Sequence, residues 1–174
     1  MRMKRIFGVL LAIGCVVFLS PGCYTLNGKA IPVELKTINV DFFENNAALV
    51  VPTLSQQFTE ALKDRIRTTT NLSIVAGEGQ SRMSGTITGY SIAPISIQAT
   101  NNNTAPIAGA SQLSITVQVK FACEVCKDKK INFDQSFTKT ANFNGDISAQ
   151  EQSLILAINK QLIDDIFNKA FNNW

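Results

Sequence analysis

Alternation of hydrophobic and polar residues predicts a β-sheet of four to five strands. Residues 36–42 place Ile38, Val40 and Phe42 on one side of an extended chain, as a half-buried strand requires. Gly89 and Pro94 interrupt a later stretch, where we expect a bulge or bend. The predicted strands cover residues 36–42, 72–76, 82–99, 112–122 and 131–143.

Two further segments repeat apolar residues at helical spacing. The first begins at Pro52 and Thr53, and the second follows Ser148-Ala149-Gln150-Glu151, which has the spacing of a capping box. The predicted buried positions of the first helix are Leu54, Phe58, Ala61, Leu62 and Ile66. Those of the second are Leu154, Ile155, Ile158, Leu162, Ile166, Phe167, Ala170 and Phe171.

The order of these elements predicts an α+β fold. Strand, helix and strand over residues 36–76 indicate a right-handed crossover between parallel strands. The last three strands are expected to form an antiparallel meander. Two helices packed on one face of a mixed sheet then give a two-layer sandwich.

The first residues have the pattern of a bacterial lipoprotein signal. A basic start is followed by an apolar run from Ile6 to Leu19 and then by Ser20-Pro21-Gly22-Cys23. We expect residues 1–22 to be cleaved, Cys23 to be acylated, and residues 23–174 to form one domain. Tyr24 stands where an Asp would indicate inner-membrane retention, so the expected place is the outer membrane, facing the periplasm. The alternative is an ordinary cleaved signal with a structural Cys23.

Charge and composition narrow the possible functions. The signal segment, residues 1–22, contains three of the 16 basic residues and none of the 13 acidic ones, so the remaining chain has no net charge. A neutral chain lacks the basic footprint of a nucleic-acid binder. The sequence also contains no histidine, which removes Ser-His and Cys-His catalysis and every imidazole metal site.

Cys123 and Cys126 form the remaining cysteine pair. The two cysteines come at the end of a predicted strand and directly before a lysine-rich turn, here called the cationic tip. A disulfide that closes a hairpin is the favoured interpretation, because the periplasm is oxidising. A redox role or a free thiol pair stays open. The tip itself is either a solvated turn or an anion contact, for example with a lipid phosphate or lipopolysaccharide. Its residues are Lys127, Lys129 and Lys130.

Motifs for catalysis are not found. Gly77-Glu78-Gly79 lacks the third glycine and the helix of a dinucleotide site. Asp164 and Asp165 are neighbours in a predicted helix, so their carboxylates point about 100° apart and cannot share a proton. We therefore expect no enzyme, no cofactor and no metal. The polar segment 98–111 is either a partner contact or a tolerated insertion.

Several segments together resemble the LptE lipopolysaccharide-assembly lipoproteins in their Bacteroidetes form. The resemblance is most specific in the run VPTLSQQFTEALKDR, residues 51–65. The other segments are YTLNG (24–28), Ile31-Pro32, Lys36-Thr37-Ile38, GTITGY (85–90) and DIFNKA (165–170). The Cys123/Cys126 hairpin and the Asn-rich loop are not part of the family pattern.

The resemblance implies an acylated, non-enzymatic lipoprotein with two helices on a four-stranded sheet. Family members plug the LptD β-barrel in one-to-one ratio, help it assemble, and assist lipopolysaccharide transfer to the outer leaflet. A polar sheet face would suit the polar lumen of a barrel. We place Thr86, Thr88, Ser114, Thr116, Gln118 and Gln135 on that face. The alternative is a free periplasmic lipid-binding or chaperone lipoprotein with an apolar cleft between helices and sheet.

Overall fold

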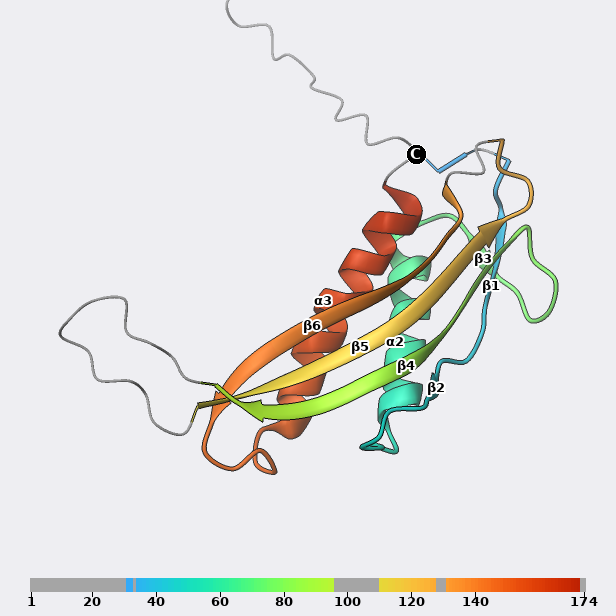
Figure 1. Cartoon of the computed structure of the whole chain (residues 1–174). Helices are drawn as coiled ribbons and strands as arrows, with labels where there is room; N and C mark the ends of the chain where they lie inside the picture. Colours follow the sequence, from blue (N-terminus) through green and yellow to red (C-terminus); the bar gives the residue numbers. More distant parts are fainter. Residues whose placement is uncertain (1–30, 33, 96–109, 128–130, 173–174) are drawn as a thin grey trace, which may run out of the picture.

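Two helices and one sheet make up the part of the chain that the structure describes. The computed structural model describes residues 31–32, 34–95, 110–127 and 131–172. Both helices lie on the same side of the sheet, behind it in the view of Figure 1. The elements are β1 (Thr37–Val40), β2 (Glu44–Asn45), α2 (Leu54–Thr69), β3 (Ser73–Ile74), β4 (Ser81–Pro94), β5 (Ala110–Cys123), β6 (Phe133–Asn144) and α3 (Glu151–Phe171).

The sheet is mixed, as the order of elements predicted. Its strand order is β3-β1-β4-β5-β6, and β2 pairs separately with β4. β1 and β3 are parallel and are joined through α2, which confirms the predicted crossover between parallel strands. β4, β5 and β6 form the predicted antiparallel meander. The ladder between β4 and β5 shifts between Ile87 and Gly89, which is the bulge expected at this glycine.

The two helices run in the same direction. Near their starts, the Gln152 carboxamide donates to Gln57 Oε1 at 3.3 Å, and further along Arg65 and Asp164 form an ion pair at 3.2 Å. Side chains from the inner faces of both helices and of the sheet fill the space between the layers. Those with no exposed surface include Ile38, Phe43, Phe58, Leu62, Val117, Val119, Ile158 and Ile166. The core is therefore continuous from one helix to the other.

The sheet holds six strands rather than four to five, because the short β2 adds one beside β4. Between Val40 and Glu44 the register against β4 shifts by one residue, and such a bulge bends the chain. At this bend the Asp41 N–H donates to the Met83 carbonyl at 2.9 Å. The bend corrects the prediction for Phe42, which is 57% exposed. Phe43 is the fully buried residue, and its N–H donates to Thr59 Oγ1 at 3.0 Å.

Three smaller predictions were also wrong. Gln135 lies opposite the buried Val119 and therefore faces the helices, not the open side of the sheet. Ala61 is exposed, because the buried stripe of α2 is narrower than predicted. No side-chain capping bond forms at the start of α3. The Asp146 carboxylate instead accepts the Ser148 N–H at 3.0 Å, and this bond lowers the pKa of Asp146.

Gly85 leaves room for the Phe43 ring, from the segment between β1 and β2, to lie close against β4. A Cβ at this position would overlap the Gln118 carbonyl oxygen and would lie 2.5 Å from Cε1 of Phe43. The Phe43 ring in turn packs against Phe58 of α2, with ring centroids 5.1 Å apart. The absence of a side chain at residue 85 thus permits the contact between the β1–β2 segment, the sheet and the first helix.

Candidate partner-binding surfaces

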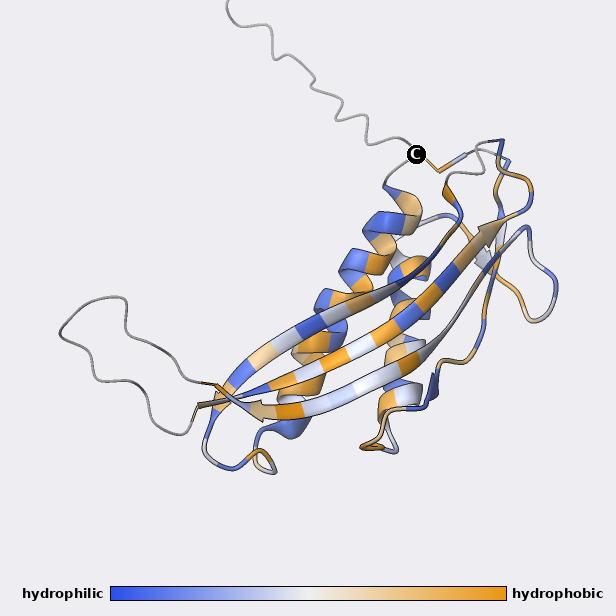
Figure 2. Cartoon of the chain, viewed as in Figure 1, coloured by the Kyte–Doolittle hydropathy of each residue, from blue (hydrophilic) through white to orange (hydrophobic). Residues whose placement is uncertain are grey.

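The side of the sheet that faces away from the helices, here called the open face, is polar. Along β4, β5 and β6 hydrophobic and hydrophilic residues alternate, which gives the banding of Figure 2. The burial of alternate residues shows that the hydrophobic side chains face the helices and the hydrophilic ones face outward. Cross-strand register places the outward residues of the three strands in rows. On β4 and β5 they include Ser84, Thr86, Ser91, Gln112, Ser114, Thr116 and Gln118, and on β6 Asp134, Ser136, Thr138, Thr140 and Asn142.

Hydrogen bonds between strands order this open face. Thr116 and Thr138 share a hydroxyl hydrogen bond of 2.9 Å, and the Gln112 carboxamide donates to Asn142 at 2.9 Å. The Gln118 carboxamide donates to Asp134 at 2.5 Å, while its oxygen accepts from the Ser136 hydroxyl. Each such group keeps further donor or acceptor capacity. The open face is therefore fixed in conformation and still able to bind polar groups of a partner.

A depression of about 310 Å³ lies on the open face beside β2. Phe42 is one of the residues that line it. The remaining lining residues are Asp41, Glu44, Ser84, Gly85, Thr86, Gln118, Lys120 and Asp134. Sequence periodicity placed Phe42 in the core, so this combination of an exposed aromatic ring and carboxylates was missed.

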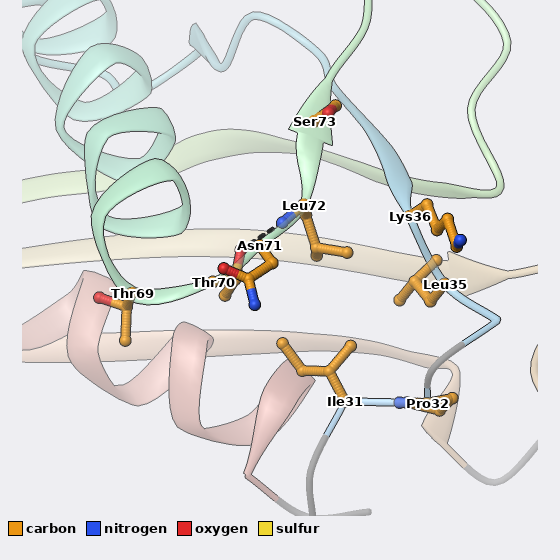
Figure 3. A pocket seen from close by; sticks show the side chains of 9 residues that line it. All are labelled: Ile31, Pro32, Leu35, Lys36, Thr69, Thr70, Asn71, Leu72 and Ser73. Carbon is orange, nitrogen blue, oxygen red and sulfur yellow. Dashed lines mark hydrogen bonds between the residues drawn. The ribbon is translucent and has the colours of Figure 1, made fainter.

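A larger hollow, of about 550 Å³, lies at the end of the molecule where residues 31–32 and 35–36 meet the end of α2 and the start of β3. Figure 3 shows the side chains of Ile31, Leu35 and Leu72 around it. Thr70 closes the turn after α2, because its hydroxyl oxygen accepts the Leu72 N–H at 3.2 Å. Polar residues on the rim include Lys36, Thr69, Asn71 and Ser73. The hollow is therefore apolar within and polar at its edge.

A third concave region, of about 290 Å³, lies between α2 and α3. Arg65 spans it, with its guanidinium paired to Asp164 and placed 5.0 Å from the centre of the Phe167 ring. Asn159 also lines the groove and is only 3% exposed. Neither polar atom of its carboxamide has a hydrogen-bond partner among the described residues. Nearby Leu156 is 54% exposed.

The hairpin after β5 holds the cysteine pair. In the structure a disulfide joins Cys123 and Cys126, whose Cα atoms are 5.5 Å apart, and both residues are buried in the core. The Asn132 side chain accepts the Cys123 N–H at 2.8 Å, which ties the hairpin to the segment before β6. Lys127 is 91% exposed and lies 3.7 Å from the Glu34 carboxylate. Because both side chains are exposed to solvent, this ion pair is weak and leaves Lys127 accessible.

Several predicted site residues lie outside the described residues. These are Cys23, Lys129 and Lys130, together with most of the polar loop. The anion contact at the cationic tip therefore stays a prediction. Within the described ranges, no group of three or more metal-ligating side chains comes together. Neither described helix is long and apolar enough to cross a membrane.

Tyr90 connects the sheet to the start of α3. Its hydroxyl donates to the Glu151 carboxylate at 2.6 Å, across 61 residues of sequence. Burial raises the pKa of the Tyr90 phenol well above its usual value, and the hydrogen bond to Glu151 raises it further. The phenol therefore stays protonated and holds the first turn of the helix as a hydrogen-bond donor. This residue has a structural role.

These features define a small two-layer α+β domain with a polar, hydrogen-bonded sheet face and no grouping of catalytic side chains in its described part. Solved structures with similarity to it include a minor lipoprotein from Acinetobacter baumannii, at 12% identity over 79% of this chain and 93% of that one, with a TM-score of 0.48. Lipoprotein B from Nitrosomonas europaea is similar at 13% identity, over 76% and 79% of the two chains, with a TM-score of 0.46. No curated protein matches the sequence.

The family follows from a different comparison. The model of the LptE family, described as lipopolysaccharide-assembly, matches residues 35–170, which is most of the chain. The protein therefore belongs to the LptE family, as the resemblance indicated. This is a family of non-enzymatic, membrane-associated lipoproteins that act in lipopolysaccharide assembly.

Proposed function

We propose that this protein is an outer-membrane lipoprotein that fills the lumen of an LptD-like β-barrel. Acyl chains on Cys23 would hold it at the periplasmic side of the membrane, since several chains together give stable anchoring where a single one does not. One copy would occupy one barrel, help the barrel to assemble, and assist lipopolysaccharide transfer to the outer leaflet. Family membership supports this proposal, and no cofactor, metal or nucleic acid is needed for it.

The observation that carries the proposal is the chemistry of the open face. Its central rows, such as Ser114, Thr116 and Thr138, hold hydroxyl and carboxamide groups that both donate and accept hydrogen bonds. A barrel lumen is polar, and a plug must lose water from its surface as it enters. Uncharged hydrogen-bonding groups cost far less to desolvate than unpaired charges do. The open face is thus suited to contact a polar wall.

The test is a pull-down from outer membranes with the full chain. We expect one large β-barrel protein to be recovered in one-to-one ratio. Thr116→Arg places a long charged side chain on the open face and should lower this recovery at least tenfold. Gln56→Arg adds the same group to an exposed position of α2 and serves as the control. Recovery of no barrel with the unmodified chain would exclude the proposal.

The anchor has its own test. Mass spectrometry of the mature protein should show an N-terminal Cys23 carrying acyl chains. In a Cys23→Ser variant whose residues 1–22 are removed, the protein should move from the membranes into the soluble periplasmic fraction. An unacylated residue 23 in the membrane-bound protein contradicts this part of the proposal without affecting the barrel contact.

The second candidate function is that of a free lipid-binding lipoprotein. The hollow lined by Ile31, Leu35 and Leu72 favours it, because an apolar recess with a polar rim suits a lipid chain. This recess lies at the end of α2, whereas the space between helices and sheet is filled with buried side chains. The free lipoprotein would extract in mild detergent as a monomer, with bound lipid detected by native mass spectrometry and no barrel.

A further inference from the structure

The exposed position of Phe42 distinguishes one part of the open face. The ring is 57% exposed on a surface that is otherwise made of hydroxyl, carboxamide and charged groups. Its position follows from the bend after Val40, which turns Phe43 into the core and Phe42 outward. A single exposed aromatic residue is not unusual on a protein surface. An aromatic ring is nevertheless well suited to anchor a partner, because it buries a large area at small entropic cost.

Of the three carboxylates around Phe42, two have no ion-pair partner among the described residues, and Glu44 also has no hydrogen-bond donor near it in that part of the chain. Asp41 is paired with Arg82 at 2.8 Å. Asp134 accepts a hydrogen bond from Gln118 and lies opposite Lys120 in the β5–β6 register. Glu44 pairs in register with Thr86, so its side chain lies on the same face, and it has no ion-pair partner among the described residues.

These two features together specify the complementary group. A guanidinium stacks on an aromatic face and binds a carboxylate through two parallel hydrogen bonds. The hydroxyls of Ser84 and Thr86 line the same depression and offer further acceptors for its remaining N–H groups. A lysine has neither the flat stacking surface nor the forked donors. Lys120 also lines the depression, but the three carboxylates of Asp41, Glu44 and Asp134 outnumber it. A lipid phosphate would therefore be repelled, and the depression favours a cationic group of a protein partner.

We propose that the depression beside Phe42 binds an arginine side chain of the barrel protein. The guanidinium stacks on the Phe42 ring and donates to the Glu44 carboxylate, so that both the exposed ring and the free charge are covered in the complex. This inference rests on the proposed function, because it assigns the open face to the wall of the barrel. It adds two points to the proposed function: the barrel is recognised mainly at the depression beside Phe42, and the barrel wall must present an arginine there.

The experiment compares variants of the full chain by quantitative recovery of the barrel. Phe42→Ala and Glu44→Gln should each lower apparent affinity about tenfold. Phe42→Trp should retain binding, whereas Phe42→Leu, which keeps an apolar side chain without a π face, should fail like Phe42→Ala. Leu156→Ala is the matched control, because Leu156 has a similar exposure on the helical layer. Thermal unfolding of every variant shows whether the fold is kept.

The outcomes separate this inference from the proposed function. If the unmodified chain recovers no barrel, both are wrong. If it recovers the barrel and Phe42→Ala recovers it equally well, only the arginine site is wrong. Equal binding by Phe42→Leu, or an equal loss with Leu156→Ala, also overturns the arginine site. Finally, a photo-crosslinking residue at position 42 should capture a barrel peptide that contains arginine, and capture of one without arginine refutes the assignment.

Discussion

Substitution of Gly85 by alanine is the most direct test of how the β1–β2 segment, the sheet and the first helix are held together. The new Cβ would overlap the Gln118 carbonyl oxygen and would lie 2.5 Å from Cε1 of Phe43. Non-bonded carbon atoms prefer separations of about 3.5–4.0 Å, so a shift of roughly an ångström is required. The oxygen belongs to the central strand β5, which has strand partners on both sides and cannot easily move.

The magnitude follows from which group moves. Inserting a methyl group into a packed core costs about 1–3 kcal/mol. If the fully buried Phe43 ring is displaced instead, the loss approaches the ~3–5 kcal/mol of a Phe→Ala substitution. Alanine also restricts the unfolded chain, which stabilises by only about 0.4–1 kcal/mol. We expect a net loss of about 3 kcal/mol in the free energy of unfolding, which lowers Tm by roughly 6–12 °C for a domain of this size.

Thermal and urea unfolding monitored by circular dichroism measure this loss. Ser84→Ala is the matched control. Ser84 is adjacent to Gly85 in sequence, but its side chain lies on the open face, so removal of the hydroxyl should change the free energy of unfolding by less than about 0.5 kcal/mol. A Gly85→Ala variant that melts within about 2 °C of the unmodified protein would refute the close packing of Phe43 against β4.

Three further predictions concern other contacts. Tyr90→Phe should lower stability by about 1–2 kcal/mol in chemical denaturation, because the Glu151 carboxylate loses its donor. Folding raises the pKa of the Tyr90 phenol, so its contribution to the free energy of unfolding is fully present at neutral pH. This contribution should be lost as the pH rises above 10.0, the usual tyrosine pKa, and thermal unfolding measured at a series of pH values tests this. Asn159→Leu should raise Tm, since it removes a buried carboxamide that has no hydrogen-bond partner in the described part of the chain, and a lower Tm would show that a partner exists. Cys126→Ser should leave lipopolysaccharide export nearly unchanged, whereas a severe export defect would indicate a redox function for Cys123 and Cys126.

Regular alternation made most of the sheet and both helices predictable. In β5 the same face holds Leu113, Ile115, Val117, Val119 and Phe121, and all five are buried. A long strand in the middle of a sheet must keep this period, because a shift of one residue would expose every apolar side chain. Amphipathic spacing fixed α2 and α3 in the same way.

The errors occur where tertiary contacts end an element. Phe42 and Phe43 are adjacent aromatic residues, and either could face the core. The sequence pattern alone cannot show that β1 ends at Val40 and that the alternation of buried and exposed residues is interrupted there. Ser148 has the spacing of a cap, yet the Asp146 carboxylate binds its N–H and α3 starts later. The polar character of the sheet face was predictable from its hydroxyl residues, but the depression beside Phe42 was not, because it depends on the bend.

The parallel direction of α2 and α3 also determines where the protein can be labelled. The hollow at the end of α2 is bordered by Ile31, and α3 reaches Phe171 at the same end, so both ends of the described chain leave from one pole (Figure 1). If Cys23 carries the proposed acyl anchor, a fluorescent protein fused after Trp174 would join the chain at the pole from which the anchored segment also leaves. The turn around Gly145, at the opposite pole between β6 and α3, is the better position for an epitope tag.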